Sequence, residues 1–448
     1  MMRILSLTAG AAQMYCGSCL RDNALAAALM ARGEDVTLLP FYTPTLTDEE
    51  NVSRPERVFF GGISVYLQQH LAIFRHTPRL LDRLWDAPKV IKALAGGAIA
   101  VHPATLGALT VSTLEGERGY QRKEIEKLLA FLADEPQPDV VNIPYTLLIA
   151  LAAPIKRILG CPVVVTLQGE DLFLEGLPER YRLRALELIK AQTADVDLFI
   201  AVSHYYADFM KSYLSIPPEK MRVAPLGITL EDIPEAAPLK RNPFTIGFLA
   251  RIAPEKGLHV LADAYILLRK ERDLPPSRLY AAGYLPPEHR RYLQRIERTL
   301  EAAGLENEFV YAGALDRRAK FAFLQGLDAF SVPSPYHEPK GLYLLEAMAA
   351  GVPVVQPLHG AFPEIIGRTG GGLLAASNAP GAIADKLMQL WQHPDRATDM
   401  GRRGREGVNA HYSIGHMADA VLRIYAEADA EWRRTGSTST IDTPAHSN

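Results

Sequence analysis

Two glutamates, Glu338 and Glu346, are the residues best suited to hold a polar ligand. They flank the predicted start of a helix in HEPKGLYLLEAMAAGVPVVQP (337–357), where Pro339 suits the first turn and Gly341 exposes the backbone. A helix N-terminus offers unpaired N–H groups and a partial positive charge, so it binds phosphate readily. Carboxylates accept paired hydrogen bonds from vicinal hydroxyls. The segment therefore predicts a ligand that places a sugar, a diphosphate, a ribose and a base in line.

Two cations, Arg251 and Lys256, stand where another predicted strand gives way to a loop, in GFLARIAPEKGLHVLADAY (247–265). Positive charges at this point would neutralise a departing diphosphate. Negative charge grows on that group in the transition state, so fixed cations assist catalysis as well as binding. An Arg and a Lys five residues apart often face solvent, and the downstream carboxylates favour the functional interpretation.

These residues require a scaffold, and the chain alternates short apolar runs with longer amphipathic stretches. This rhythm is typical of βα units that build a parallel sheet with helices on both faces. Buried strands are expected at 3–7, 34–40, 138–143, 161–167 and 197–203, with a helix at 22–33, and a second series at 245–250, 278–283, 309–314, 329–334 and 352–357. The segment 233–244 between the two series is typical of a linker. The sequence predicts an α/β protein with two Rossmann-like lobes, with ligands bound at the carboxyl ends of the strands in a cleft between the lobes.

Composition narrows the class of protein further. The 448 residues are 48% hydrophobic and carry 48 basic and 51 acidic side chains, a net charge of −3 that does not favour a nucleic-acid partner. No apolar run approaches the roughly 20 residues that span a bilayer. Three cysteines are too few for a disulfide framework and favour a reducing compartment, so the expected location is the cytoplasm. Cys16 and Cys19 form C-x-x-C without a second Cys/His pair, so no metal site is predicted.

The segment 338–355 resembles the signature of the retaining glycosyltransferases of family four, E-P-x-G-L-x-x-L-E-A-M-A-x-G-x-P-V-V. That family shares the GT-B fold with bacterial glycogen synthases. The resemblance implies that Glu338 contacts the donor sugar and Glu346 the ribose hydroxyls. It also places the intervening Lys340, Gly341 and Leu342 in the donor site.

The resemblance extends to both lobes. Arg251 and Lys256 match the family's G-R-x-x-x-x-K-G segment, with Ala250 in place of the usual Gly. In AGAAQMYCGSCLRDNALAAAL (9–29), Gly17 and Asp22 stand where the family has a Gly-rich turn near the donor phosphates and an Asp near the acceptor.

The segment VVVTLQGEDLF (163–173) resembles a family strand that ends in T-x-H-G, with Gln168 where a His is common. An amide donates and accepts hydrogen bonds but transfers no proton, which argues against a side-chain base here. Gln168 and Gly169 are assigned to the acceptor or sugar side, and the following acidic pair, Glu170 and Asp171, is equally consistent with acceptor contact and with ordinary strand-end residues.

Two further landmarks match the family less specifically. AVSHYYADFMKSYLSIPPEKMRVAPLGI (201–228) resembles a landmark in which a Ser ends a strand and a short helix leads to a final strand that closes with P-x-G. Gly227 is expected to give the backbone room at the cleft. HGAFPEIIGRTGGGLLA (359–375) resembles the G-G-x-x-E-I loop, with His359 in place of the first Gly. Glu364 in this loop either faces the cleft or caps a helix.

The segment 59–94 is similar to an insertion of the glucan-synthase branch that lies beside the acceptor. Its five basic and two acidic residues lie among Leu, Ile, Phe and Trp. Basic amphipathic helices can rest on anionic membranes, so weak peripheral membrane contact is one interpretation. Contact with the acceptor or packing in the core is favoured, because two Asp and two Pro residues interrupt the membrane-facing side.

The resemblance implies transfer of a sugar from a nucleotide-diphosphate sugar to an acceptor hydroxyl, carbohydrate or other, with no tightly bound cofactor and no metal. Residues 1–235 are expected to form the acceptor lobe and 240–412 the nucleotide-sugar lobe. A helical segment, 413–434, should pack back toward the N-terminal lobe, and the tail 435–448 lacks the apolar content to order itself. Alternatives are an epimerase or phosphorylase on the same fold, or an inactive nucleotide-sugar-binding protein. The base, sugar, acceptor and oligomeric state are left open.

Overall fold

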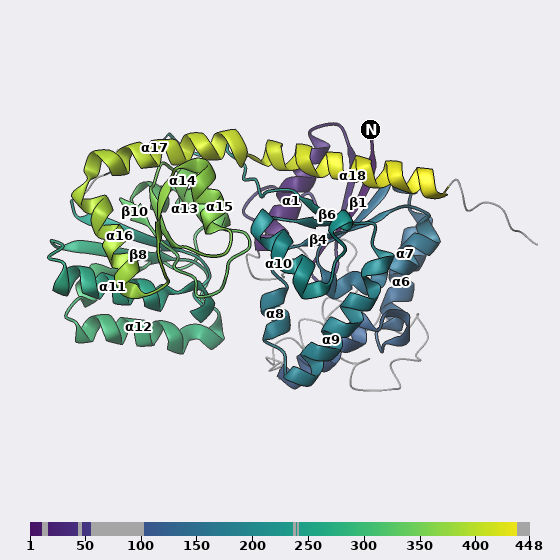
Figure 1. Cartoon of the computed structure of the whole chain (residues 1–448), viewed down its shortest axis with the longest axis horizontal. Helices are drawn as coiled ribbons and strands as arrows, with labels where there is room; N and C mark the ends of the chain where they lie inside the picture. Colours follow the sequence, from purple (N-terminus) through teal and green to yellow (C-terminus); the bar gives the residue numbers. More distant parts are fainter. Residues whose placement is uncertain (11–16, 44–46, 55–102, 236–238, 240–241, 437–448) are drawn as a thin grey trace, which may run out of the picture. The chain divides into compact units, whose positions relative to one another are not determined.

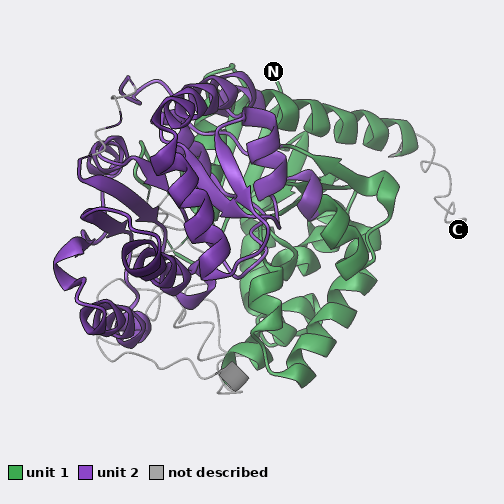
Figure 2. Cartoon of the chain, turned by 60° about the vertical axis from the view of Figure 1, so that its left-hand side comes forward, with its two compact units in different colours: residues 1–202, 207–224, 418–448 green, residues 203–206, 225–417 purple. Residues whose placement is uncertain are grey.

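The computed structural model describes residues 1–10, 17–43, 47–54, 103–235, 239 and 242–436. The chain forms two compact units (Figure 2). Unit 1 comprises Met1–Val202, Ala207–Ala224 and Ala418–Asn448, and unit 2 comprises Ser203–Tyr206 and Pro225–Met417. The predictions for Cys16, for the insertion at 59–94 and for nearly all of the tail lie outside the described residues.

Unit 1 contains a six-stranded parallel sheet in the order β2-β1-β3-β4-β5-β6. Figure 1 labels three of its strands, β1, β4 and β6. The strands are β1 (Arg3–Thr8), β2 (Asp35–Pro40), β3 (Val140–Ile143), β4 (Val163–Leu167), β5 (Leu198–Ala201) and β6 (Met221–Val223). The α-helices are α1 (Gly17–Met30), α5 (Pro103–Leu114), α6 (Arg122–Asp134), α7 (Ala152–Leu159), α8 (Asp171–Glu175), α9 (Glu179–Gln192) and α10 (His204–Leu214), whose first three residues group with unit 2, and α18 (Ile414–Gly436), which begins in unit 2. Strands β3, β4 and β5 are buried along their whole length, as expected for a sheet covered on both faces.

A row of polar side chains crosses the middle of this apolar sheet. The Nδ2 of Asn142 on β3 donates to the Oγ of Ser6 on β1 at 3.2 Å. The Oγ1 of Thr166 on β4 donates to the Oδ1 of Asn142 at 2.7 Å. All three residues are buried, and each finds a partner within the row, as burial of polar groups requires.

Unit 2 contains a second six-stranded parallel sheet, in the order β12-β11-β10-β7-β8-β9. Its strands are β7 (Phe244–Leu249), β8 (Ser277–Ala282), β9 (Phe309–Tyr311), β10 (Ala329–Phe330), β11 (Val354–Pro357) and β12 (Gly372–Ala375). The helices are α11 (Leu258–Glu271), α12 (Arg290–Ala302), α13 (Arg317–Gln325), α14 (Leu342–Ala349), α15 (Phe362–Thr369), α16 (Pro380–Gln392) and α17 (Pro394–His411). Helix α11 packs on α12 and α16, and α17 packs on α14, α15 and α16.

The predicted fold class, two α/β units with parallel sheets, is confirmed. Every expected strand is present, whereas β12 was not predicted, because its sequence GLLA follows glycines that are typical of a loop. The first helix begins at Gly17 rather than at residue 22 and ends at Met30. Its first turns carry Arg21, Asp22 and Asn23, which are polar yet buried, so they do not show the apolar spacing of a core helix.

The end of the chain adds to unit 1. On α18 the carboxylate of Glu427 pairs with the guanidinium of Arg222, and the indole N–H of Trp432 donates to the carbonyl of Gly160 at 3.0 Å. None of the helices among the described residues is both long and apolar enough to cross a membrane.

A glycine holds two loops of unit 2 against each other. Gly257 has a φ of +78° and is the N-cap of α11. A Cβ built there would lie 2.0 Å from the backbone oxygen of Pro333, in the loop after β10. Since backbone cannot yield as a side chain can, this position accepts only glycine.

We expect Gly257→Ala to destabilise unit 2 more than Gly304→Ala. Gly304 also has positive φ, +66°, but no atom of the described residues lies within 4 Å of the position that a Cβ would take there. The control should therefore lose only the left-handed strain, about 1–2 kcal/mol, whereas Gly257→Ala should lose roughly 1–3 kcal/mol more for the backbone shift. Urea unfolding of both variants measures this, and equal losses would contradict it.

Candidate functional site

Three loops of unit 2 leave the carboxyl ends of neighbouring strands. They follow β7, β10 and β11, which are adjacent in the sheet order. The first carries Arg251 and Lys256, the second Glu338 and the third Gly360. Because all strands are parallel, these loops meet at one edge of the sheet.

The central contact of this edge is an ion pair between Lys256 and Glu338. The Nζ of Lys256 donates to Oε2 of Glu338. The Glu338 side chain is only 4% exposed and that of Lys256 18% exposed, so the pair is largely out of water. Two residues predicted for catalysis are thus brought together.

The backbone of Glu338 is fixed by the loop after β11. The N–H of Ala361 donates to the carbonyl oxygen of Glu338 at 2.8 Å. A Cβ at Gly360 would lie 2.7 Å from that same oxygen, so glycine is needed for this approach. On the other side, the Oγ of Ser334 lies 2.7 Å from the carbonyl of Glu255, next to Lys256. Both partners of the ion pair therefore lie in loops that are hydrogen-bonded to a neighbouring loop.

The charge state of Glu338 follows from these contacts. Burial by itself would raise its pKa, but the charge and hydrogen bond of Lys256, with the nearby Lys340, outweigh burial and hold the pKa below its usual range. The hydroxyl of Tyr343 also approaches Oε2 at 3.4 Å, and burial beside this carboxylate keeps the pKa of Tyr343 well above its usual value. Glu338 is therefore an anion and Tyr343 a neutral donor at neutral pH.

The predicted helix start is confirmed as α14. Its N-cap is Gly341, with a φ of +71°, and no side chain of the described residues caps the helix. The N–H groups of Leu342 and Tyr343 have no partner within the helix and are available to an anion, whereas those of Leu344 and Leu345 donate to the carbonyl of Gly341. The backbone N–H of Lys340 points back to Oε1 of Glu338 at 3.4 Å.

The second predicted carboxylate, Glu346, lies on α14 and has its own lysine. The Nζ of Lys320 on α13 donates to its Oε1 at 2.6 Å, and both side chains are mostly buried. Sequence reasoning missed Lys320 because it stands 26 positions away on another helix, within a segment without a recognisable motif. It missed Tyr343 because an aromatic residue in a helix is typical of the core.

Arg251 takes a different position from Lys256. Its guanidinium pairs with Glu255, one residue before Lys256, and the Arg251 side chain is 43% exposed. Arg251 is thus a solvent-accessible cation at the same turn, rather than part of the buried pair.

His359, noted in the sequence only as a departure from the family, stacks on His337 with ring centroids 4.5 Å apart. Burial and the neighbouring His337 lower the pKa of His359 to about 4, so its ring is neutral near pH 7. Both of its ring nitrogens are buried without a hydrogen-bond partner in the described part of the chain.

Glu364 caps a helix. Its two carboxylate oxygens accept the backbone N–H groups of His204 and Tyr205, each at 3.2 Å, at the start of α10. The Oγ of Ser203, the landmark Ser, donates to the carbonyl of Pro339 at 2.9 Å. Gly227 packs against backbone at Ser413, where a Cβ would lie 2.2 Å from the carbonyl oxygen.

Unit 1 brings Asp22 and Gln168 together. The Nε2 of Gln168 donates to Oδ1 of Asp22 and to the carbonyl of Pro144, both at 3.1 Å. Arg21 also pairs with Oδ1 of Asp22, at 3.1 Å. Burial raises the pKa of Asp22 against the opposing effect of Arg21. Gly17 is the first residue of α1 and Gly169, with a φ of +99°, turns the chain after Gln168.

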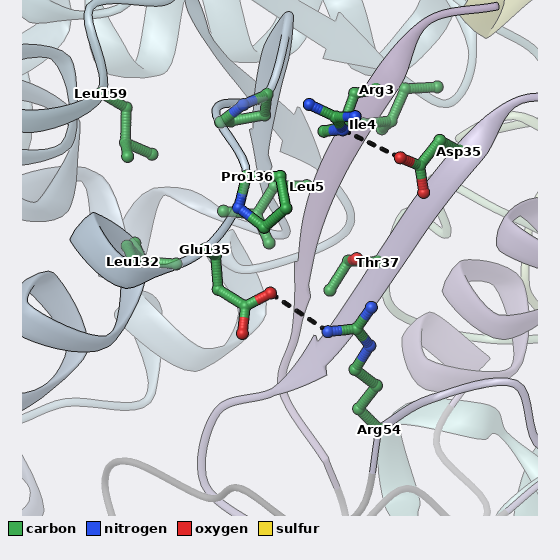
Figure 3. A pocket seen from close by; sticks show the side chains of 11 residues that line it. Arg3, Ile4, Leu5, Asp35, Thr37, Arg54, Leu132, Glu135, Pro136 and Leu159 are labelled. Atoms are coloured by element: carbon green, nitrogen blue, oxygen red, sulfur yellow. Dashed lines mark hydrogen bonds and ion pairs between the residues drawn. The ribbon is translucent and has the colours of Figure 1, made fainter.

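Among the described residues, hollows also lie away from these side chains. One of about 80 Å³ lies at the amino ends of β1 and β2 (Figure 3), where Arg3 pairs with Asp35 at 2.8 Å and Arg54 with Glu135 at 3.2 Å. It is too small for a nucleotide sugar and lies at the sheet edge opposite to Asp22 and Gln168. Another, of about 300 Å³, lies beside Pro254 between α11 and α12. Within the described ranges, no three His, Cys, Asp or Glu side chains are grouped to hold a metal ion.

The two parallel-sheet units, with a helix N-terminus set between two lysine-bound glutamates, define the protein as one of GT-B architecture. A family model for "Glycosyl transferases group 1" matches residues 230–407, and one for "Glycosyltransferase Family 4" matches residues 110–232. The chain belongs to the group 1 glycosyltransferases.

Curated relatives agree with this family. The chain is 28% identical over 224 residues to the putative colanic acid biosynthesis glycosyltransferase WcaL of Escherichia coli (strain K12). The matched region covers 48% of this chain and 53% of that protein. The chain thus spans about half the length of that relative. It is 25% identical over 362 residues to a 2-deoxystreptamine glucosyltransferase of Streptomyces kanamyceticus, covering 78% and 89% of the two chains.

Solved structures show the same fold. A sucrose-phosphate synthase from Thermosynechococcus elongatus has a TM-score of 0.70 at 18% identity, covering 96% of this chain and all of that one. HepE of Anabaena, solved in complex with UDP and glucose, has a TM-score of 0.64 at 16% identity, covering 95% and 100%.

Removal of Lys256 tests the central ion pair. The lowered pKa of native Glu338 contributes stability that is present above the pKa of the unfolded chain and is lost as pH falls through the folded pKa. In Lys256→Met the buried carboxylate of Glu338 lacks its cation, so its pKa should rise. Protonation at lower pH should then remove the unpaired buried charge. We expect the free energy of unfolding to be lower than that of the native protein by about 3–5 kcal/mol at pH 7. This difference should become smaller as the pH approaches 4.

Urea unfolding of unit 2 at pH 7 and at pH 4.5 measures this difference. Arg251→Met is the matched control, because its pair with Glu255 is far more exposed, and it should lose at most about 1 kcal/mol at either pH. A Lys256→Met loss that is independent of pH would contradict the assignment.

Proposed function

We propose that the protein transfers a sugar from a nucleotide-diphosphate sugar to an acceptor hydroxyl, with the anomeric configuration retained. The observation that carries this proposal is the arrangement around α14. An anionic, buried Glu338 precedes the helix, Glu346 lies inside it, and the uncapped N-terminus lies between them. This order fits a ligand with a sugar, a diphosphate and a ribose in sequence.

Each residue then has a defined role. Glu338 accepts hydrogen bonds from the donor sugar, and Glu346 accepts them from the ribose hydroxyls. Gly341 and Leu342 offer backbone N–H groups to the diphosphate, while Lys340, Lys256 and the exposed Arg251 supply positive charge. In unit 1, Gly17 lies on the phosphate side, and Asp22, Gln168 and Gly169 on the sugar or acceptor side.

The proposed chemistry needs no protein nucleophile. The bond between the anomeric carbon and the diphosphate breaks while the acceptor oxygen bonds to the same face of that carbon. The proton of the acceptor hydroxyl passes to the leaving phosphate oxygen, and Lys256, Arg251 and the α14 N-terminus stabilise the negative charge left on the diphosphate. Gln168 cannot accept this proton in exchange for one of its own, so it only orients a substrate.

The relatives support a nucleotide-sugar donor without fixing its base. One, from Mycobacterium tuberculosis (strain ATCC 25618 / H37Rv), is named a GDP-mannose-dependent mannosyltransferase. HepE of Anabaena was solved with UDP-glucose. The donor class proposed is therefore a nucleoside-diphosphate hexose, and the acceptor a carbohydrate or another hydroxyl compound.

A donor panel tests this function. The protein is incubated with UDP-, GDP- and ADP-hexoses, with and without sugar acceptors, and the released nucleoside diphosphate and the products are measured. Acceptor-dependent release with an unchanged anomeric configuration by NMR supports the proposal. Phosphate-dependent cleavage would indicate a phosphorylase, isomerised donor an epimerase, and binding by calorimetry without turnover an inactive relative.

The two cations should matter to catalysis. We expect removal of either, in Arg251→Ala or Lys256→Ala, to slow transfer roughly 10²–10³-fold, as for other fixed groups that stabilise charge in a transition state. Steady-state rates with the donor found in the panel measure this. A double variant that retains native turnover would rule out this role.

Lys320 should affect binding of the nucleotide. In Lys320→Met, Glu346 loses the partner that fixes its Oε1, so we expect the Kd for the matching nucleoside diphosphate to rise roughly 10-fold, as for one lost hydrogen bond to a charged group. Arg317→Met is the control, because Arg317 lies on the same helix and pairs with Asp232 instead. Calorimetry should show an unchanged Kd for the control, and equal effects of both variants would contradict the assignment.

A further inference from the structure

Glu170 is a buried carboxylate that joins the ends of two neighbouring strands of unit 1. Its Oε1 accepts both the backbone N–H and the Oγ1 hydroxyl of Thr146, each at 3.1 Å, after β3. Its Oε2 accepts the backbone N–H of Gln168 at 2.8 Å, after β4. Glu170 therefore points inward and does not line a ligand surface.

These bonds determine what surrounds the Gln168 side chain. The amide nitrogen of Gln168 donates to the carbonyl of Pro144, two residues before Thr146, and to Asp22. Glu170 thus fixes the backbone of Gln168 and the segment that supplies one of its two acceptors. Both partners accept hydrogen bonds, so a flipped amide would set its oxygen against a carbonyl and a carboxylate.

The amide therefore has one allowed orientation, which leaves its oxygen unpaired. The Oε1 of Gln168 is buried and accepts no hydrogen bond from the described residues. A buried acceptor without a donor is unfavourable by about 1–3 kcal/mol. Such an acceptor is suited to a ligand that donates hydrogen bonds, such as a sugar with free hydroxyls.

We propose that Glu170 is a positioning residue that fixes the Gln168 amide so that its carbonyl oxygen is offered to a substrate hydroxyl. The proposal rests on the proposed function for the identity of the ligand as a sugar. It assigns Glu170 no contact with substrate. It also explains how a Gln serves at this position: a neutral acceptor with fixed polarity recognises a hydroxyl and does not recognise a phosphate oxygen.

The variant Glu170→Gln tests the positioning. It keeps the size of the side chain and an oxygen for Thr146, but its NH₂ group faces the N–H of Gln168, so that bond is lost. Glu175→Gln is the matched control, since Glu175 lies on the adjoining α8 and pairs with Arg182 and Tyr213. If Glu170→Gln unfolds below the assay temperature, Glu170→Asp replaces it.

The first readout does not depend on activity. With ¹⁵N-glutamine labelling, the side-chain amide of Gln168, assigned by its loss in Gln168→Ala, should exchange with solvent at least 10-fold faster in Glu170→Gln than in the native protein or in Glu175→Gln. Unchanged protection overturns the proposal. This holds even if the native protein transfers no sugar, so failure of the proposed function is recognised separately.

The second readout is a double-mutant cycle on the transfer reaction. We expect Glu170→Gln to raise the KM of one substrate roughly 10-fold, with a smaller effect on kcat, and to raise it no further when Gln168 is already Ala. A merely structural role predicts additive effects of the two substitutions and a common change in kcat. Additive effects therefore overturn the proposal.

Discussion

The candidate donor site depends on the ion pair between Lys256 and Glu338. Without a cation beside it, burial would raise the pKa of this carboxylate, and a protonated acid would lose part of its capacity to accept hydrogen bonds from a sugar. The surrounding features serve this contact. Gly257 and Gly360 allow two loops to approach backbone to backbone, and the N–H of Ala361 holds Glu338 in place. The second carboxylate repeats the arrangement, since Glu346 has Lys320. In each case a lysine holds the carboxylate in a single orientation.

The architecture could be predicted because its signals are local. Buried parallel strands have a continuous apolar composition, and the spacing of such runs gives the number and order of βα units. Local signals fail where the composition of a segment is not typical of the element that it forms. The strand β12 follows a run of glycines, and the first turns of α1 bury three polar residues. Neither feature is written in a short window of sequence, because each depends on what the rest of the unit packs against it. The facing of two lobes across a cleft stays a prediction.

The candidate site was predicted as single residues and not as a network. Glu338, Glu346, Lys256 and the start of α14 were found from one motif and one loop. The partners Lys320 and Tyr343 were not, because a lysine on another helix and an aromatic residue in a helical run carry no positional signal. The same reason applies to Glu170, for which the sequence was equally consistent with contact to the acceptor and with an ordinary strand-end residue. Its proposed positioning role depends on Thr146, 24 positions earlier, which only the sheet order brings near.

The polar row of Ser6, Asn142 and Thr166 has a consequence for folding specificity. Strands made almost wholly of Val, Ile and Leu could slide past one another with little change in apolar burial, because every register buries similar surface. A shift of β3 by one residue would turn the Asn142 amide away from both neighbours and leave three buried polar groups unsatisfied. These hydrogen bonds thus favour a single register of β1, β3 and β4. The register fixes which residue follows the end of each strand. It therefore also fixes the positions of Glu170 and of the Gln168 amide.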